Sequence, residues 1–202
     1  MTLFYIAAPF GNYIHTKKAK SVVGTFTLRP RAGLLKQIVK TLRVRDGVWY
    51  NSLGLRNPGI HYGIRKFYRD PSKDIAFSIA AIEPGDWQKL SKIVPDDIDV
   101  ELNISCPNVT HFKHYAKGID SFLNDKRKVI IKLSPKTTDR LVEELVAHGF
   151  SSFHCCNTLP TEHGSMSGKD LRPYVENLCD TIRFYKRDAE IIAGGGIETI
   201  DD

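Results

Sequence analysis

The sequence predicts an α/β protein built around a parallel β-sheet. Short apolar runs recur along the chain, and near-continuous apolar runs are typical of strands that are covered on both faces. Segments with helical spacing separate the later runs, and this alternation is typical of βα units. With 202 residues and 42% hydrophobic content, the chain is long enough to form one substantial core.

The predicted strands are short and rich in β-branched and aromatic side chains. In chain order they are residues 3–8, 21–24, 75–79, 98–103, 129–133, 152–156 and 190–194.

Amphipathic spacing predicts helices between the later strands. They cover residues 86–94, 138–148 and 170–185. Pro95 follows the first of these helices, and Gly149 is well placed to end the second.

Residues 28–69 interrupt this alternation with a long connection. It contains a helix-like part, residues 34–42, and a turn-rich part, residues 51–59. Long connections in compact domains are usually functional. No low-complexity linker or internal repeat divides the chain, so we expect a single domain over residues 1–202.

The charge balance favours anionic partners without pointing to nucleic acid. The chain has 29 Lys+Arg against 23 Asp+Glu and a formal net charge of +6. Its short basic clusters, residues 17–20 and 126–128, carry no recognition motif, so solvated surfaces explain them and no nucleic-acid partner is expected.

The cysteines and the hydropathy pattern indicate a cytoplasmic protein. Cys106, Cys155, Cys156 and Cys179 lack metal-binding spacing and are expected to be free thiols of a reducing compartment, with no metal site. No run approaches the roughly 18 apolar residues of a membrane span, and the first residues lack the basic start of a signal peptide. A membrane partner is therefore not expected.

Polar residues and glycines collect where the predicted strands end. They are Asn103, Cys106, Lys132, Asn157, Thr158 and residues 194–196. Taken singly, an asparagine at a strand end usually makes a turn, and a triple glycine is usually a tight turn. Lys132 within an apolar run needs an anionic partner or an opening to water. Because the carboxyl ends of barrel strands form the active-site face, their joint occurrence favours a site there.

Five separated segments resemble motifs of the dihydroorotate dehydrogenase family. NISCPN at residues 103–108 resembles the family's N-x-S-[CS]-P-N, and NSLGLRN at 51–57 is similar to its N-x-x-G-L-x-N loop. Residues 131–135 resemble its K-L-x-P strand end, and residues 192–197 resemble its glycine turn. The family segment between that strand end and that glycine turn is matched by residues 157–158, 164–168 and 171–173.

The resemblance implies an FMN-dependent oxidoreductase on a (β/α)8-type barrel that oxidises dihydroorotate to orotate in pyrimidine biosynthesis. Cys106 occupies the position of the base, and a thiol, with a reference pKa of about 8.5, is a better base near neutrality than a hydroxyl. In this family, cysteine at that position marks the soluble class 1 enzymes.

The other roles that the resemblance implies divide between substrate and cofactor. The substrate residues are Asn51, Gly54, Leu55, Asn103, Asn108, Asn157 and Thr158, whose amides suit a planar imide. The cofactor residues are Ala7, Ala8, Thr25, Asn103, Lys132, Gly168, Gly195 and Gly196. Lys132 is expected beside the flavin N1/O2 edge, and Gly195 and Gly196 beside the FMN phosphate.

Two departures from the family pattern stand out. Gly24 occupies the position of a lysine that contacts flavin and substrate in the family, and Arg29, Arg31 or Arg56 are candidates to compensate. The chain also ends at Asp202, before the eighth strand and helix, so about seven of eight βα units are expected. A sheet with open edges needs cover, and a homo-oligomer is therefore expected.

Three functions are consistent with these features. The first is oxidation of dihydroorotate or a close pyrimidine analogue. The second is a family member that binds flavin or another ligand without turnover. The third is an unrelated barrel that binds a phosphate ligand. Fumarate, NAD and quinone are alternative electron acceptors in the family, and Cys106 argues only against quinone.

Overall fold

The computed structural model describes residues 4–68, 74–104, 118–156 and 158–197. The chain divides into two compact units. Unit 1 comprises Met1–Ala32, Leu55–Ile104 and Val109–Ile130, and unit 2 comprises Gly33–Gly54, Ser105–Asn108 and Ile131–Asp202.

The main sheet has seven strands whose order in space follows their order in the chain. In that order they are β1 (Phe4–Ile6), β2 (Ala19–Thr27), β5 (Ile75–Ala80), β6 (Val100–Asn103), β7 (Val129–Leu133), β8 (Ser152–Cys155) and β11 (Glu190–Ala193). The pairs β1–β2, β2–β5, β5–β6 and β8–β11 are parallel. Sequential strands with α-helices between most of them make an α/β fold of the (β/α)8-barrel type, with seven strands among the described residues, which confirms the predicted class.

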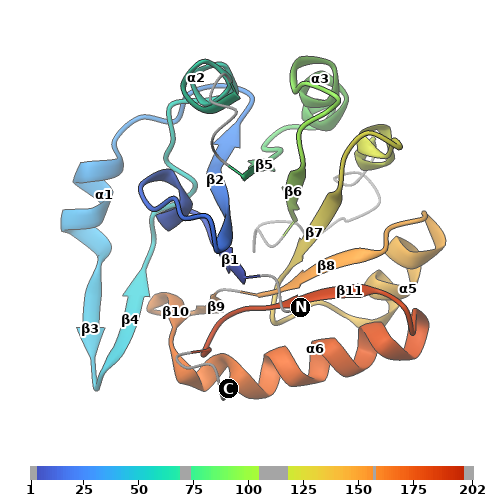
Figure 1. The fold of residues 1–202 in the computed structure, drawn as a ribbon. Coiled ribbons are helices and arrows are strands. Elements are labelled where there is room, and N and C mark those ends of the chain that lie inside the picture. The colour runs from blue at the N-terminus through green and yellow to red at the C-terminus, as the bar shows by residue number, and fades with distance from the viewer. Residues whose placement is uncertain (1–3, 69–73, 105–117, 157, 198–202) are drawn as a thin grey trace. The chain divides into compact units, whose positions relative to one another are not determined.

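Unit 1 is built on β2, β5 and β6 and is covered by α3 (Asp86–Ile93) (Figure 1). Every residue of β5 is buried, as expected for a strand covered on both faces. Trp87 and Leu90 of α3 are buried, and the Trp87 ring packs edge-on against Phe122 at 6.1 Å. Asp86, the first residue of the helix, fixes the preceding turn by accepting hydrogen bonds from the backbone N–H groups of Ile82 and Glu83, both at 3.0 Å. Short helical turns complete the unit: Phe10–Asn12, α2 (Ile60–Gly63), Ile64–Tyr68 and Ile119–Phe122.

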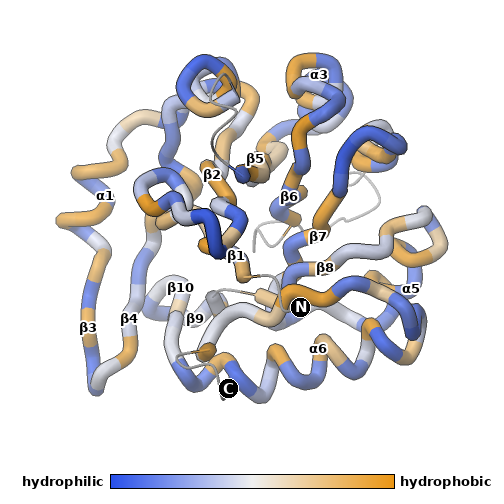
Figure 2. The backbone as a smooth tube through the Cα atoms, viewed as in Figure 1, coloured by the Kyte–Doolittle hydropathy of each residue, from blue (hydrophilic) through white to orange (hydrophobic). Residues whose placement is uncertain are grey.

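Unit 2 places α5 (Asp139–Ala147) and α6 (Arg172–Tyr185) beside β8 and β11. Thr138 caps α5, because its side chain accepts from the Leu141 N–H. Apolar and polar residues alternate along α6 (Figure 2), and its buried residues are Val175, Leu178 and Ile182. This i, i+3, i+7 spacing is the stripe that predicts the helix from sequence. A short turn, Lys169–Leu171, leads into α6.

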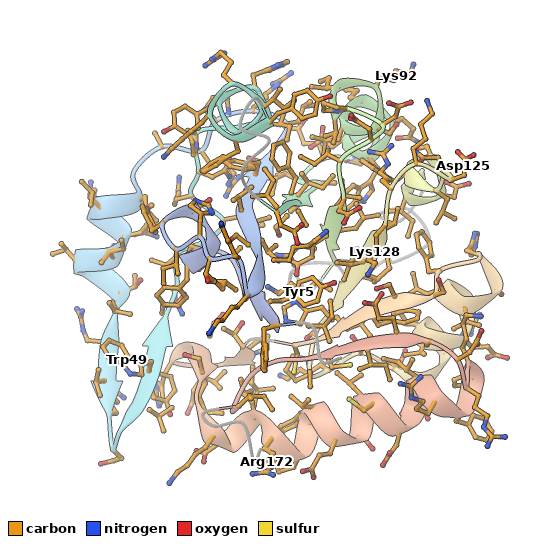
Figure 3. All side chains as sticks on the ribbon, viewed as in Figure 1. Tyr5, Trp49, Lys92, Asp125, Lys128 and Arg172 are labelled. Atoms are coloured by element: carbon orange, nitrogen blue, oxygen red, sulfur yellow. The ribbon has the colours of Figure 1, made fainter. Side chains whose placement is uncertain are left out.

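A second, antiparallel sheet in unit 2 was not expected from the sequence. Its order is β3 (Arg43–Arg45), β4 (Val48–Asn51), β10 (Gly164–Ser167) and β9 (Leu159–Thr161). β4 pairs with β10, so that Asn51 stands opposite Ser165. Trp49 projects from β4 (Figure 3) and is half-exposed, as is Val44, its cross-strand partner. The strands are short and carry mixed polar side chains, so no period-2 signal marks them.

The predicted elements of the main sheet are otherwise confirmed with small shifts at their ends. The second strand is longer than predicted and has a register shift between Val23 and Phe26, around Gly24. The helix-like part of the long connection is α1 (Leu34–Thr41), none of whose residues is buried. Within the part of the chain that the structure describes, no helix is long and apolar enough to cross a membrane.

Candidate functional site

A chain of hydrogen-bonded side chains links the carboxyl-terminal parts of β2, β5 and β6 in unit 1. We call Thr25, Ser78, Glu101 and Asn103 the strand-end cluster. Ser78 Oγ donates to Glu101 Oε1 at 2.7 Å, Thr25 Oγ1 and Ser78 Oγ are 2.9 Å apart, and Asn103 Nδ2 donates to Thr25 Oγ1 at 3.3 Å. Glu101 is 1% exposed and Ser78 is fully buried, so these bonds form away from bulk water.

Gly24 precedes this cluster and has no room for a side chain. Its φ is +114°, and a Cβ there would lie 2.4 Å from the Ser78 carbonyl oxygen. The Asn12 side chain holds the Gly24 backbone from the other side, donating to the Gly24 carbonyl at 3.0 Å and accepting from the Gly24 N–H at 2.8 Å. In this structure, position 24 therefore accommodates glycine and excludes the lysine of the family pattern.

Asn57 organises the turn-rich segment within unit 1. Its Oδ1 accepts from the N–H groups of Thr27 and Gly59 at 3.1 and 2.8 Å. Its Nδ2 donates to the Leu55 carbonyl at 2.7 Å, which fixes Leu55 in a left-handed conformation with φ 54°. Of the candidate compensating arginines, Arg56 donates to the Ala32 carbonyl at 3.1 Å, and Arg29 is exposed.

Asn51 lies at the end of β4 in unit 2. Its Nδ2 donates to the Ser165 carbonyl at 3.5 Å, and its Oδ1 accepts from the Leu53 N–H at 3.5 Å. A Cβ on Gly164 would lie 2.6 Å from the Asn51 carbonyl oxygen, so glycine permits this close approach of β10. Gly54 follows with φ 63°.

Lys132 is a buried cation of unit 2. It lies on β7 and is 5% exposed, and burying a charged amine is costly without polar neighbours. The charge of Lys132 acts on the Cys156 thiol. Burial raises the pKa of Cys156 to about 12, and the positive charge of Lys132 opposes that rise.

Two further thiols of unit 2 form a pair that the sequence did not indicate. The Cys155 thiol on β8 hydrogen-bonds Cys179 on α6, which raises the pKa of Cys155 and lowers that of Cys179. Both are free cysteines.

The glycine turn after β11 packs against the segment that begins α6. A Cβ on Gly195 would lie 2.7 Å from the Cys156 carbonyl oxygen. A Cβ on Gly196 would lie 3.1 Å from the Gly168 carbonyl oxygen and 3.2 Å from the backbone nitrogen of Arg172. We call Gly168, Gly195 and Gly196 the glycine cradle. A glycine turn beside a helix start leaves backbone N–H groups open to an anion.

The structure thus brings some of the predicted site residues together within each unit. In unit 1, Thr25 and Asn103 are joined directly, and Ala7 and Ala8 follow β1, where Ala7 accepts from the Gly11 N–H at 3.2 Å. In unit 2, the glycine cradle forms one group, while Asn51 and Lys132 lie on β4 and β7, and half-buried Thr158 precedes β9. Cys106, Asn108 and Asn157 lie outside the described residues.

Sequence reasoning missed Ser78, Glu101 and Asn12. Glu101 carried a signal, because an acidic residue within an apolar strand needs a buried partner. The serine of a buried strand and an asparagine in a short turn carried none.

Comparison with known proteins finds similarity to the proteins whose motifs the sequence resembles. The chain is 34% identical over 186 residues to the catalytic subunit of dihydroorotate dehydrogenase B (NAD(+)) of Alkaliphilus oremlandii, covering 77% of this chain and 61% of that protein. It is 30% identical over 187 residues to the subunit of the same name from Alkaliphilus metalliredigens, again covering 77% and 61%. No family model matches the chain.

A solved structure supports the fold independently. A crystal structure of DHODH from Eimeria tenella, in complex with ferulenol, superposes with a TM-score of 0.67 at 18% identity, covering 88% of this chain and 63% of that one. The chain therefore spans about three fifths of the length of the relatives it matches. Strand order, motifs and sequence similarity agree in making the chain similar to the dihydroorotate dehydrogenases.

Proposed function

We propose that this chain oxidises dihydroorotate to orotate, with FMN as cofactor. The glycine cradle is the observation that carries the proposal. Its three glycines have positive φ, and a Cβ on Gly195 or Gly196 would press against neighbouring backbone. Such a turn is of use where a ligand must approach the main chain closely.

The residues of the cradle fit the phosphate of FMN. The start of α6 carries the positive end of a helix dipole, and the Arg172 nitrogen is close to Gly196. Gly195 and Gly196, with Gly168, would hold the phosphate through backbone N–H groups. FMN, when bound, would supply the acceptor for the hydride.

Cys106 is the proposed base. Oxidation of the C5–C6 bond requires a proton to leave one carbon while hydride leaves the other, and the Cys106 thiolate would take that proton. Asn51, Asn103, Asn108 and Asn157 would bind the ring, with Gly54, Leu55 and Thr158 shaping the same site, because each amide offers a donor and an acceptor.

Lys132 would stabilise negative charge that develops at the cofactor. A buried ammonium in a low-dielectric setting interacts more strongly with such charge than an exposed one does. Thr25, Ala7 and Ala8 would line the approach to the ring system. A homo-oligomer in the cytoplasm is part of the same proposal.

Absorbance and anaerobic reduction of the purified chain test the proposal. We expect flavin bands after incubation with FMN and bleaching of those bands by dihydroorotate. Cys106→Ala should retain the bands and lose at least about 10²-fold in reduction rate, as expected for removal of a general base. Cys156→Ala is the matched control, since it removes a buried thiol that follows β8, and its flavin should bleach normally. Bound flavin that stays oxidised with saturating dihydroorotate would reject the proposal.

One observation favours a second function, flavin binding without turnover. Gly24 cannot carry the lysine of the family pattern without displacing the Ser78 carbonyl. A charge-assisted hydrogen bond to the substrate carboxylate is typically worth about 1.5–3 kcal/mol. Flavin binding with weak orotate affinity and no bleaching would support this second function.

A further inference from the structure

The strand-end cluster has a fixed direction of hydrogen bonding. Ser78 has one hydroxyl proton and donates it to Glu101 Oε1 at 2.7 Å. Ser78 Oγ must therefore accept from Thr25 Oγ1, 2.9 Å away.

The same reasoning extends to Asn103. Thr25 has also used its one proton, so its Oγ1 can only accept from Asn103. The group that faces Thr25 at 3.3 Å must therefore be the Asn103 amide nitrogen, Nδ2, and the amide oxygen, Oδ1, takes the other position.

We propose that Glu101 and Ser78 are positioning residues that fix the orientation of the Asn103 amide, so that the amide presents its oxygen to the ligand and selects a ring with an N–H group there. This rests on the proposed function in one respect only, the assignment of Asn103 to the substrate ring. The amide orientation itself follows from the hydrogen bonds.

The chemistry of Glu101 explains why a carboxylate stands at the start of this series of hydrogen bonds. An ionised carboxylate only accepts hydrogen bonds, whereas a glutamine could donate as well. Burial of Glu101, Ser78 and Asn103, at 1%, 0% and 8% exposure, keeps water from supplying alternative partners. Glu101→Gln would therefore allow the direction of every hydrogen bond in the series to reverse. The Asn103 amide group would then rotate so that its oxygen faces Thr25.

Unit 2 offers a matched control. Ser152 Oγ donates to Glu190 Oε2 at 3.0 Å, and Ser152 is also buried, on β8. Glu190→Gln and Ser152→Ala remove the same kinds of group as Glu101→Gln and Ser78→Ala, without touching the strand-end cluster.

Hydrogen exchange of the side-chain amide tests the orientation without flavin or orotate. In chain labelled with ¹⁵N-asparagine, the Asn103 signal is identified by its loss in Asn103→Asp. We expect one Asn103 Nδ2 proton to exchange at least about tenfold more slowly than that of exposed Asn124. Glu101→Gln and Ser78→Ala should each abolish this protection, while Glu190→Gln and Ser152→Ala should preserve it. Protection that survives both cluster substitutions would overturn the proposal.

Ligand discrimination tests the selection. Equilibrium dialysis compares orotate with its N1-methyl and N3-methyl derivatives. We expect the unmodified chain to bind orotate at least about tenfold more tightly than one of these derivatives, which is about 1.4 kcal/mol. Glu101→Gln should reduce that ratio to about twofold, and Glu190→Gln should leave it unchanged. An undiminished ratio in Glu101→Gln would overturn the selection, whereas absence of orotate binding to the unmodified chain would instead reject the proposed function.

Discussion

The strand-end cluster of unit 1 and the glycine cradle of unit 2 hold polar groups in opposite ways. In the cluster, four side chains on three strands bond to one another, and each depends on the identity of the next. In the cradle, side chains are absent, and at Gly195 and Gly196 neighbouring backbone lies within distances that a Cβ would violate. The comparison teaches that the first site is disrupted by removing or changing a polar atom, and the second by adding a carbon.

Gly24 shares a feature with each site. It adjoins the strand-end cluster, and, like Gly195 and Gly196 of the cradle, it has no room for a Cβ. Gly24→Ala should lower the free energy of unfolding by roughly 4 kcal/mol, since a Cβ 2.4 Å from the Ser78 carbonyl combines steric overlap with an unfavourable φ. Urea denaturation followed by circular dichroism measures this change.

Gly47→Ala separates the two causes of that loss. Gly47 also has positive φ, +78°, but a Cβ there has no heavy atom within 4 Å among the described residues. We expect it to cost only about 1–2 kcal/mol. Equal losses for the two substitutions would show that overlap with Ser78 has no energetic weight.

Gly195→Ala tests the cradle directly. A Cβ there would lie 2.7 Å from the Cys156 carbonyl oxygen, so we expect a loss of about 2–3 kcal/mol and at least about tenfold weaker FMN binding. Gly168→Ala, with φ +131° but no atom of the described residues within 4 Å of its Cβ, should lower the free energy of unfolding less. Fluorescence titration with FMN measures the affinity. Unchanged FMN affinity in Gly195→Ala would show that the cradle does not bind the FMN phosphate.

The smallest expected change in stability concerns the amino-terminal ends of the strands, opposite the strand-end cluster. In unit 1, Lys20 on β2 pairs with Asp99 and, at 3.0 Å, with Asp74, whereas β8 and β11 of unit 2 use the uncharged donor Ser152 at the corresponding end. Burial alone lowers the pKa of Lys20, but the hydrogen bonds and charges of the two aspartates outweigh burial and raise it above 10.5.

A raised lysine pKa stabilises the folded state below the unfolded value, and this contribution disappears as the pH rises through the folded value. Between pH 9 and a pH above 10.5, the unmodified chain should therefore lose up to about 1 kcal/mol more stability than Lys20→Met does. Denaturation at a series of pH values measures the difference, and identical pH profiles would remove Lys20 from this role.

The main sheet was predictable because burial leaves a strong mark on sequence. A strand such as β5, buried at every residue, is an apolar run interrupted only by Ser78, and α6 shows one apolar stripe. The antiparallel sheet was not predictable, because β3 is an exposed Arg-Val-Arg segment whose partner selection depends on tertiary contacts.

The candidate site was predictable to a similar degree. The motifs indicated Thr25 and Asn103, which are bonded to each other, and Gly168 and Gly196, which are close in space. They did not indicate Ser78 or Asn12, because a neutral polar residue is compatible with many local environments and only its three-dimensional neighbours define its role.

The pairing of β4 with β10 has a consequence for synthesis of the chain. Asn51 and its partner Ser165 are 114 residues apart in sequence. At about 5–20 residues per second, a ribosome would release β3 and β4 roughly 6–23 s before β10. An isolated two-stranded hairpin is marginally stable in water. During that interval the segment with Val44 and Trp49 lacks its third strand, so its apolar side chains are open to other chains until β10 has been synthesised.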